Sequence, residues 1–268
     1  MHTSTRGFTL SLIIAATVLC AVQVNAQRVT KARGVRAPVS DQTSKRQDIE
    51  NIVREYLIKN PEVIREAMQA LQEKEEAQKK LGLAENMKKL RPEIFSDASA
   101  PVTGNASGDV AVVVFYDYFC GYCKKTLPEL QNLVAKDHSV KIIYKEFPIL
   151  GAQSLIAARA ALAAARQGKF EAFHREMIES DSASDEAIKA ISDKLGLDWA
   201  QLRKDMNDPQ IDATIERNQK LATALNIEGT PAYLVGDRII PGAIDSESLA
   251  RLINDERAKL ARVPAEFP

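Results

Sequence analysis

The feature that most constrains this chain is an apolar run that ends just before a pair of cysteines. Val110 to Tyr116 is almost unbroken and rich in β-branched residues, which is typical of a strand buried on both faces. Cys120 and Cys123 follow, and residues 124–134 then carry apolar side chains at helical spacing. The sequence therefore predicts a C-x-x-C motif at the point where a buried strand passes into a helix.

The N-terminus is typical of an exported protein. Arg6 precedes an apolar run from Phe8 to Val24, and small residues lead to a cleavage site after Ala26, so residues 1–26 are interpreted as a signal peptide. A membrane anchor is the alternative, but polar residues interrupt the run and a span needs about 20 apolar residues. Lipid attachment at Cys20 is a further alternative, although a bulky leucine precedes it. Cleavage would remove Cys20 from a chain of three cysteines.

The two remaining cysteines favour redox chemistry. A structural zinc site needs four ligands, and the mature chain would add only His138 and His174 to the two thiols. A disulfide across two residues closes too small a loop to stabilise the fold much. At a helix start, free backbone N–H groups and the helix dipole stabilise a thiolate, which is the nucleophile in disulfide exchange. We expect Cys120 to attack and Cys123 to resolve, with no cofactor and no metal.

The segment before the strand is predicted to be helical. Residues 27–47 are polar and basic and are interpreted as a flexible leader, whereas apolar residues recur at helical spacing from Asp48 and again from Pro61 to Pro92. Residues 48–90 are therefore expected to form a homo-oligomer, with packing on the main domain as the alternative. The candidate interface comprises Ile49, Ile52, Val53, Tyr56, Leu57, Val63, Ile64, Met68 and Leu71.

The remaining elements alternate between strands and helices. Residues 96–109 are predicted to be a loop, 140–144 a second buried strand, and about 151–225 a series of helices. Two short strands, 232–235 and 238–240, flank Gly236-Asp237 as a hairpin, and 246–260 is a closing helix. The chain has 36 lysine and arginine residues and 36 aspartate and glutamate residues. It therefore lacks the net positive charge that would indicate nucleic-acid binding.

Three segments carry a resemblance to a known family. "FYDYFCGYC", "YKEFPILG" and "GTPAYLVGDRIIPG" together resemble the DsbA-like branch of the thioredoxin superfamily over residues 109–262. The resemblance implies an α/β thioredoxin fold with a helical insertion, in a domain at 104–262. The flexible leader and the helical segment, together residues 27–95, precede that domain. "VREYLIKNPEVIREAMQAL" further resembles the N-terminal region of the ScsC-type subgroup, which are periplasmic proteins linked to copper tolerance.

The resemblance also implies roles for single residues. In this family the proline that faces the C-x-x-C motif is cis, so Thr230 and Pro231 are expected to bind substrate. Gly121 and Tyr122 are expected to tune the redox poise, and together with Thr230 they resemble disulfide isomerases of the DsbC kind.

The usual proton-transfer group of the family is missing from its place in the strand. Val114 occupies a position where many relatives have a buried acid. Asp117, Lys145 and Glu146 are candidates to replace it, with Glu146 as the proton-transfer candidate, although charges at strand ends are usually solvated. His174 is interpreted as a core or surface residue.

These features together predict a periplasmic thiol-disulfide oxidoreductase. The expected activity is disulfide isomerisation or reduction of cysteine-containing exported proteins, with electrons from a membrane thiol reductase and a link to copper tolerance. A monomeric DsbA-like thiol oxidase is one alternative. A copper-binding dithiol protein is another, because paired thiols suit Cu(I), but the methionine- or histidine-rich tracts of copper carriers are missing.

Overall fold

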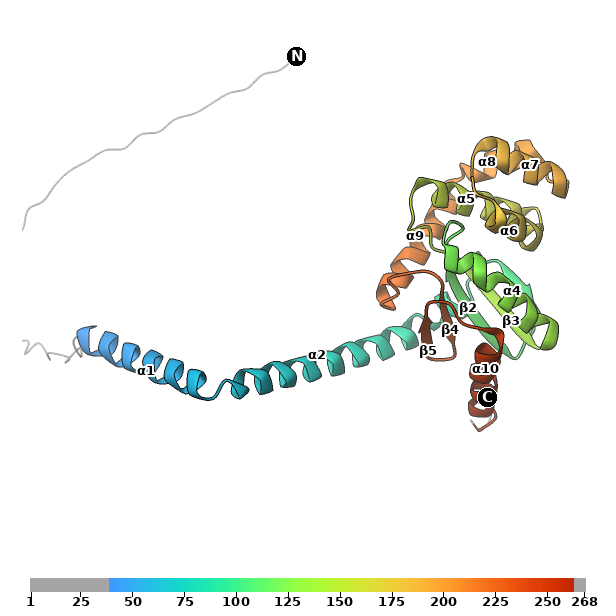
Figure 1. Ribbon diagram of the computed structural model, residues 1–268. Coiled ribbons are helices and arrows are strands. Elements are labelled where there is room, and N and C mark those ends of the chain that lie inside the picture. Colours follow the sequence, from blue (N-terminus) through green and yellow to red (C-terminus); the bar gives the residue numbers. More distant parts are fainter. Residues whose placement is uncertain (1–38, 263–268) are drawn as a thin grey trace, which may run out of the picture. The chain divides into compact units, whose positions relative to one another are not determined.

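The computed structural model describes residues 39–262 (Figure 1). The described part of the chain divides into two units, one up to Glu66 and one from Ala67 onward. In the described part of the chain, no helix combines the length and apolar character needed to cross a membrane.

The first unit contains helix α1 (Val39–Lys59) and the start of helix α2 (Glu62–Lys89). Helix α1 begins well before Asp48, so the predicted leader is wrong for residues 39–47. That stretch contains neither glycine nor proline, and its polar side chains gave no periodic pattern to detect. Asn60 follows the last residue of α1, and both its backbone N–H and its side-chain amide donate to the Tyr56 carbonyl, at 2.8 and 2.9 Å. The next residue, Pro61, has no N–H with which to continue the helix.

Most residues of the candidate oligomer interface are exposed within the single chain. Its large side chains retain roughly half or more of their accessible surface, with values of 48% for Ile64 and 67% for Ile52 and Met68. The exposed members are Ile49, Ile52, Val53, Tyr56, Ile64, Met68 and Leu71.

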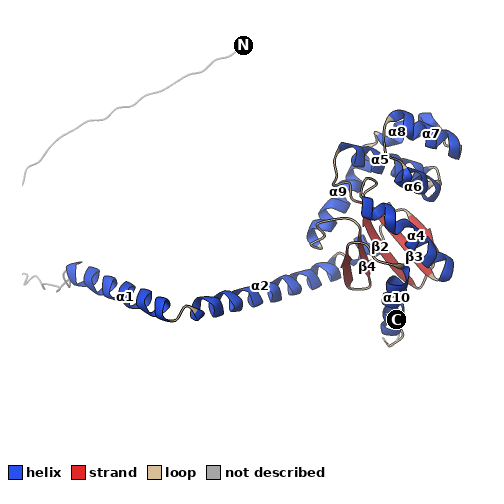
Figure 2. Cartoon of the chain, in the orientation of Figure 1, coloured by secondary structure: helices blue, strands red, loops and turns tan. Residues whose placement is uncertain are grey.

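The second unit contains a five-stranded mixed sheet in the order β1-β3-β2-β4-β5, with helices on both faces (Figure 2). Strand β2 runs parallel to β3, whereas β1 pairs antiparallel with β3, β4 with β2, and β5 with β4. The strands are β1 (Val102–Gly104), β2 (Val110–Tyr116), β3 (Val140–Glu146), β4 (Ala232–Val235) and β5 (Arg238–Pro241). The helices are α3 (Arg91–Phe95), α4 (Gly121–Lys136), α5 (Ala152–Arg166), α6 (Phe170–Glu179), α7 (Asp185–Leu195), α8 (Trp199–Met206), α9 (Pro209–Ala224) and α10 (Ser246–Leu260).

Strand β2 is apolar throughout because both of its faces are covered. Val112, Val114 and Tyr116 belong to one buried cluster, which includes residues of α4, α6 and α10. Val113 and Phe115 belong to a second cluster on the other face. The predicted α/β thioredoxin fold, with the insertion α5–α9 between β3 and β4, is confirmed.

The end of α2 and all of α3 are part of this second unit. Met87 and Ile94 are 5% and 0% exposed and pack in the second cluster, and Asn86 donates to the Ala224 carbonyl at 2.8 Å. The predicted segment 27–95 therefore does not end where the sheet domain begins, because its last turns complete the core. Strand β1 was missed within the predicted loop 96–109, since three residues are too short for a detectable alternation.

Candidate functional site

Cys120 lies at the helix start, as the sequence predicts. Strand β2 ends at Tyr116, and after three residues Cys120 forms the N-cap of α4 with extended backbone angles. Its sulfhydryl donates a hydrogen bond to the Thr230 carbonyl at 3.1 Å, and its side chain is 7% exposed. Both Cys120 and Cys123 are free thiols. The Cys120 sulfur thus sits at a helix N-terminus, where the first backbone N–H groups have no partner within the helix.

Cys123 is in the first turn of the same helix and more deeply placed, with 3% of its surface exposed. Burial raises the pKa of Cys123 well above its usual value, and the neighbouring Cys120 adds to the increase. Cys123 is therefore a neutral thiol in the reduced protein. Its attack on a disulfide formed at Cys120 would require stabilisation of the Cys123 thiolate.

Thr230 and Pro231 lie opposite the cysteines. The peptide bond between them is cis, in agreement with the expectation from the resemblance. The Thr230 carbonyl accepts the Cys120 hydrogen bond, and the Pro231 carbonyl accepts from Gly242 N–H at 2.8 Å, which ties this loop to the end of β5. The backbone beside the sulfur is thus held in one position.

The two residues between the cysteines are open to solvent. A Cβ atom added at Gly121 would meet no other atom within 4 Å, and Tyr122 is 62% exposed. Lys125 lies over the Tyr122 ring at 5.6 Å, whereas Lys124 donates to the Ser180 carbonyl at 2.9 Å and pairs with Asp181. Tyr122 therefore offers an aromatic contact next to the thiol, while Lys124 is engaged elsewhere.

Asp117 has a structural position before the motif. One oxygen accepts from Phe119 N–H and from the Ser154 hydroxyl, both at 2.8 Å. The other accepts from the backbone N–H groups of Ile149 and Leu150 at 2.8 and 3.0 Å. This carboxylate connects the loop before Cys120 to the loop after β3 and to the start of α5.

Glu146 is buried, so it is not one of the solvated charges that are usual at strand ends. Tyr116 donates to Glu146 Oε1, Tyr118 donates to the same oxygen at 3.5 Å, and the Tyr118 hydroxyl is 3.1 Å from His174 Nδ1. Burial raises the pKa of Glu146 well above its usual value and the Asp117 charge adds to this effect, whereas the hydrogen bonds from Tyr116 and Tyr118 act in the opposite direction. Burial also lowers the pKa of His174 to about 3, so the imidazole is neutral.

A narrow cavity of about 10 Å³ links this group to the resolving thiol. Its walls include Val114, Tyr116, Cys123, His174 and Pro231. The volume is at the lower limit for one water molecule. The sequence did not predict the roles of Tyr116, Tyr118 and His174, because the only signal available was the placement of two tyrosines around the end of the strand.

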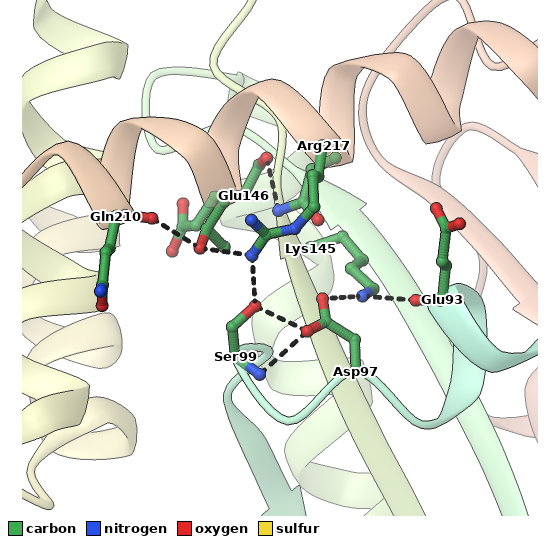
Figure 3. Close-up of polar contacts among 9 residues, drawn as sticks. Glu93, Asp97, Ser99, Lys145, Glu146, Gln210 and Arg217 are labelled. Carbon is green, nitrogen blue, oxygen red and sulfur yellow. Dashed lines mark hydrogen bonds and ion pairs between the residues drawn. The ribbon is translucent and has the colours of Figure 1, made fainter.

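Lys145 lies away from the cysteines, because neighbouring residues on a strand face opposite sides of the sheet. It is completely buried, pairs with Asp97 at 2.7 Å and donates to the Glu93 carbonyl at 2.8 Å (Figure 3). Burial lowers the pKa of Lys145, and Asp97 offsets part of that effect. The residue joins β3 to the segment after α3, so it is neither a solvated charge nor part of the thiol site.

Comparisons with known proteins agree with this geometry. The family model described as a DSBA-like thioredoxin domain matches residues 111–254, and the model of the copper resistance protein ScsC N-terminal domain matches residues 46–78. A thioredoxin-like oxidoreductase from Silicibacter pomeroyi DSS-3 is 43% identical, with 63% of this chain and 98% of that chain covered and a TM-score of 0.61. Proteus mirabilis ScsC in a transitional conformation is 28% identical, with 81% and 96% covered and a TM-score of 0.60.

Curated relatives add two further findings. A probable disulfide bond formation protein D from Bacillus anthracis is 26% identical, with 62% of this chain and 82% of the relative covered. The chain spans about a quarter of the length of two Na⁺/H⁺ antiporters from Salinispora tropica and Salinispora arenicola that it also matches, at 26% and 24% identity. With its family model covering more than half of the sequence, the chain belongs to the family of DsbA-like thioredoxin domains.

Proposed function

We propose that this protein is a thiol-disulfide oxidoreductase that isomerises or reduces disulfides in exported proteins. The observation that carries the proposal is the placement of Cys120. Cys120 is the N-cap residue of a helix, and its sulfur contacts the Thr230 carbonyl and neighbours a second thiol in the first turn of that helix. The relatives named as oxidoreductase and as disulfide bond formation protein support the same chemistry.

The reaction requires two exchange steps. The Cys120 thiolate attacks one sulfur of a substrate disulfide, forming a mixed disulfide and releasing the other substrate sulfur as a thiolate. In reduction, Cys123 loses its proton and attacks the Cys120 sulfur, which forms the Cys120–Cys123 disulfide and releases the second substrate thiolate to take up a proton. In isomerisation, a different substrate thiolate attacks the mixed disulfide and regenerates Cys120. An extended substrate segment beside Thr230 fits the first step, because the attacking sulfur already contacts that backbone.

Glu146 is the proposed proton-transfer residue for the buried thiol of Cys123. Burial raises its pKa well above the usual value, and Tyr116 and His174 connect its environment to the cavity beside Cys123. A proton leaving Cys123 could pass through one water in that cavity rather than through the protein surface.

The direction of electron flow is inferred from the motif and the N-terminal helices. Gly121-Tyr122 with Thr230 resembles isomerases, and an isomerase must be kept reduced, which calls for a membrane thiol reductase as electron donor. The exposed apolar residues of α1 and α2, together with the match to the ScsC N-terminal model, support a homo-oligomer. Oligomerisation would obstruct bulky oxidase partners while unfolded chains still enter. A signal sequence in residues 1–26, which lie outside the described residues, would deliver the protein to the periplasm.

Refolding of a scrambled multi-disulfide protein tests the proposal. The reduced chain is expected to restore the enzymatic activity of scrambled ribonuclease, and Cys120→Ser is expected to abolish this effect. The oxidised chain, added to fully reduced ribonuclease, is expected to act slowly. Rapid oxidation without isomerisation would identify an oxidase instead, and inactivity in both assays would reject the exchange reaction.

A further inference from the structure

Tyr233 shares a sheet face with both cysteines. It lies on β4, two residues after Pro231, and pairs with Val114 across the β2–β4 ladder. Paired residues on neighbouring strands point to the same face, and Tyr233, Val114 and the cysteines belong to one buried cluster. Val114 cannot exchange a proton or donate a hydrogen bond. The side chain directly opposite it has a phenolic hydroxyl.

That hydroxyl is buried and lacks a hydrogen-bond partner among residues 42–262. In the same part of the chain, the other such side-chain atom is Glu146 Oε2. Leaving a buried hydroxyl unpaired costs about 1–3 kcal/mol, and a phenylalanine in the same space would avoid that cost. The Tyr233 hydroxyl is therefore a hydrogen-bond donor that the described residues leave unused.

The polar neighbours of this hydroxyl are Tyr144 on β3 and residues at the start of α4. Thr126, one turn after Cys123, donates to the Cys123 carbonyl at 3.1 Å, and its hydroxyl lies near the Tyr233 hydroxyl without hydrogen-bond geometry between them. Burial raises the pKa of Tyr233 well above its usual value, Thr126 acts in the opposite direction, and the charges of Cys123 and Cys120 raise it further. The phenol therefore holds its proton at neutral pH and is available as a hydrogen-bond donor. The buried Cys123 sulfur already has hydrogen bonds with the Asp117 backbone and the Thr230 side chain that lower its pKa, and burial still raises that pKa overall, so a further donor would help to stabilise its thiolate.

We propose that the Tyr233 hydroxyl donates a hydrogen bond to the Cys123 sulfur as that sulfur becomes a thiolate, and so accelerates the resolving step. The inference rests on the proposed exchange at Cys120 and Cys123. Tyr233 keeps its proton throughout. The proton from Cys123 leaves for solvent or the released sulfur, the bond between Cys120 and the bound thiol breaks, and the Cys120–Cys123 bond forms. No external oxidant is needed, because the mixed disulfide supplies the oxidising equivalent.

Ellman's reagent separates the two steps in one experiment. All samples carry Cys20→Ser, so that Cys120 and Cys123 are the only thiols. A first aromatic thiolate is released when Cys120 attacks the reagent, and a second when Cys123 resolves the mixed disulfide. Stopped-flow absorbance follows both phases for the reduced chain and for Tyr233→Phe. The first phase is expected to be unchanged, and the second to be about 10-fold slower, as expected for loss of a hydrogen bond to a charged group.

Thermal unfolding of the reduced proteins provides the structural control. Tyr233→Phe is expected to unfold at the same or a higher temperature, because it removes an unpaired buried hydroxyl. A slower second phase in a variant of undiminished stability therefore assigns the effect to the hydroxyl. A second phase at the wild-type rate, or an equal slowing of both phases, overturns the proposal while leaving exchange at the cysteines intact. Absence of both phases in the unsubstituted chain overturns the exchange reaction itself.

Discussion

The sulfhydryl of Cys120 donates to the carbonyl oxygen of Thr230 across 3.1 Å, joining the helix start to a loop far away in the sequence. When Cys120 ionises, this hydrogen bond is lost and the carbonyl becomes available. An incoming substrate segment can then use that acceptor, so ionisation of the nucleophile and exposure of the substrate contact are coupled.

Substitution of each cysteine by serine is expected to block a different step of the exchange reaction. Cys120→Ser should abolish exchange, because the remaining Cys123 is buried and its pKa is raised, so it rarely forms a thiolate. Cys123→Ser should still attack but should accumulate mixed disulfides. Non-reducing gels and mass spectrometry of a reaction with a peptide disulfide measure both outcomes. Normal turnover by Cys120→Ser would reverse the assignment.

The position of an N-terminal truncation is expected to decide whether the domain folds. A chain that begins at residue 81 keeps Leu83, Met87, Leu90 and Ile94, all of which pack on the sheet. It should fold as a monomer, lose scrambled-substrate refolding and behave more like an oxidase. A chain that begins at residue 96 should be strongly destabilised, since truncating one buried isoleucine already costs about 2–5 kcal/mol.

Circular dichroism and light scattering distinguish these two chains from the longer protein. Ile94→Ala in the full chain is the matched single-site variant, because Ile94 is completely buried and removal of its side chain leaves a cavity. A full chain that runs as a monomer, or a chain from residue 81 that isomerises as well as the full chain, would contradict the role of the N-terminal helices.

Asp97→Asn is expected to destabilise the fold by about 3–5 kcal/mol at neutral pH, because it leaves the buried Lys145 without its counter-charge. Burial alone would raise the pKa of Asp97, but the Lys145 ammonium and Ser99 bring it below its usual value. The unfolded state therefore binds the proton more readily, so the wild-type advantage exists above about pH 3.9 and is lost as the pH falls through the folded pKa.

Urea unfolding at several pH values measures that difference. The control is Asp212→Asn, which breaks an ion pair with Arg159 of the same length, 2.7 Å, on an aspartate whose side chain is 49% exposed. Its cost should be below about 1 kcal/mol. Equal losses from both substitutions would show that burial of Lys145 does not set the penalty.

Glu146→Gln is expected to make the protein less sensitive to alkaline pH. Burial raises the folded pKa of Glu146, so the folded state holds the proton more tightly than the unfolded state. The stability that this proton supplies is complete below about pH 4.3 and declines as the pH rises through the folded pKa. The variant should match the wild type in mild acid and melt at a higher temperature at neutral and higher pH. A melting difference that does not change with pH would argue against a protonated Glu146.

A control and an activity measurement complete this test. Glu171→Gln removes an exposed carboxylate from the first turn of α6 and should leave the pH profile unchanged. If Glu146 transfers protons for Cys123, Glu146→Gln should also slow release of the second thiolate from Ellman's reagent without changing the first.

The sequence was sufficient to predict the elements whose pattern is strong. Strands β2 and β4 and helix α10 begin and end where predicted, because long apolar runs and well-placed turn residues mark them. Helix α1 was predicted too short, since its first turns are polar and its formation depends on local propensity rather than on an apolar face.

The site was predictable only in part. Cys120 and Thr230 stand out through motif and resemblance, but their contact joins residues that are distant in sequence. The sequence did not show which of Lys145 and Glu146 lies near the cysteines. Adjacent residues of a strand point to opposite faces, and the packing of α3 and α6 determines what each face contacts. Tyr233 gave no signal, since a tyrosine in a strand usually indicates packing alone.

The four hydrogen bonds accepted by Asp117 have a consequence for local unfolding. One carboxylate holds the amides of Phe119, Ile149 and Leu150 and the hydroxyl of Ser154, so a displacement of Asp117 weakens the hydrogen bonds of all these segments together. The loop before the nucleophile and the entrance to the helical insertion should therefore exchange their amide hydrogens as one cooperative unit. A substrate that pulls on the first would loosen the second, so the insertion would register occupancy of the thiol site.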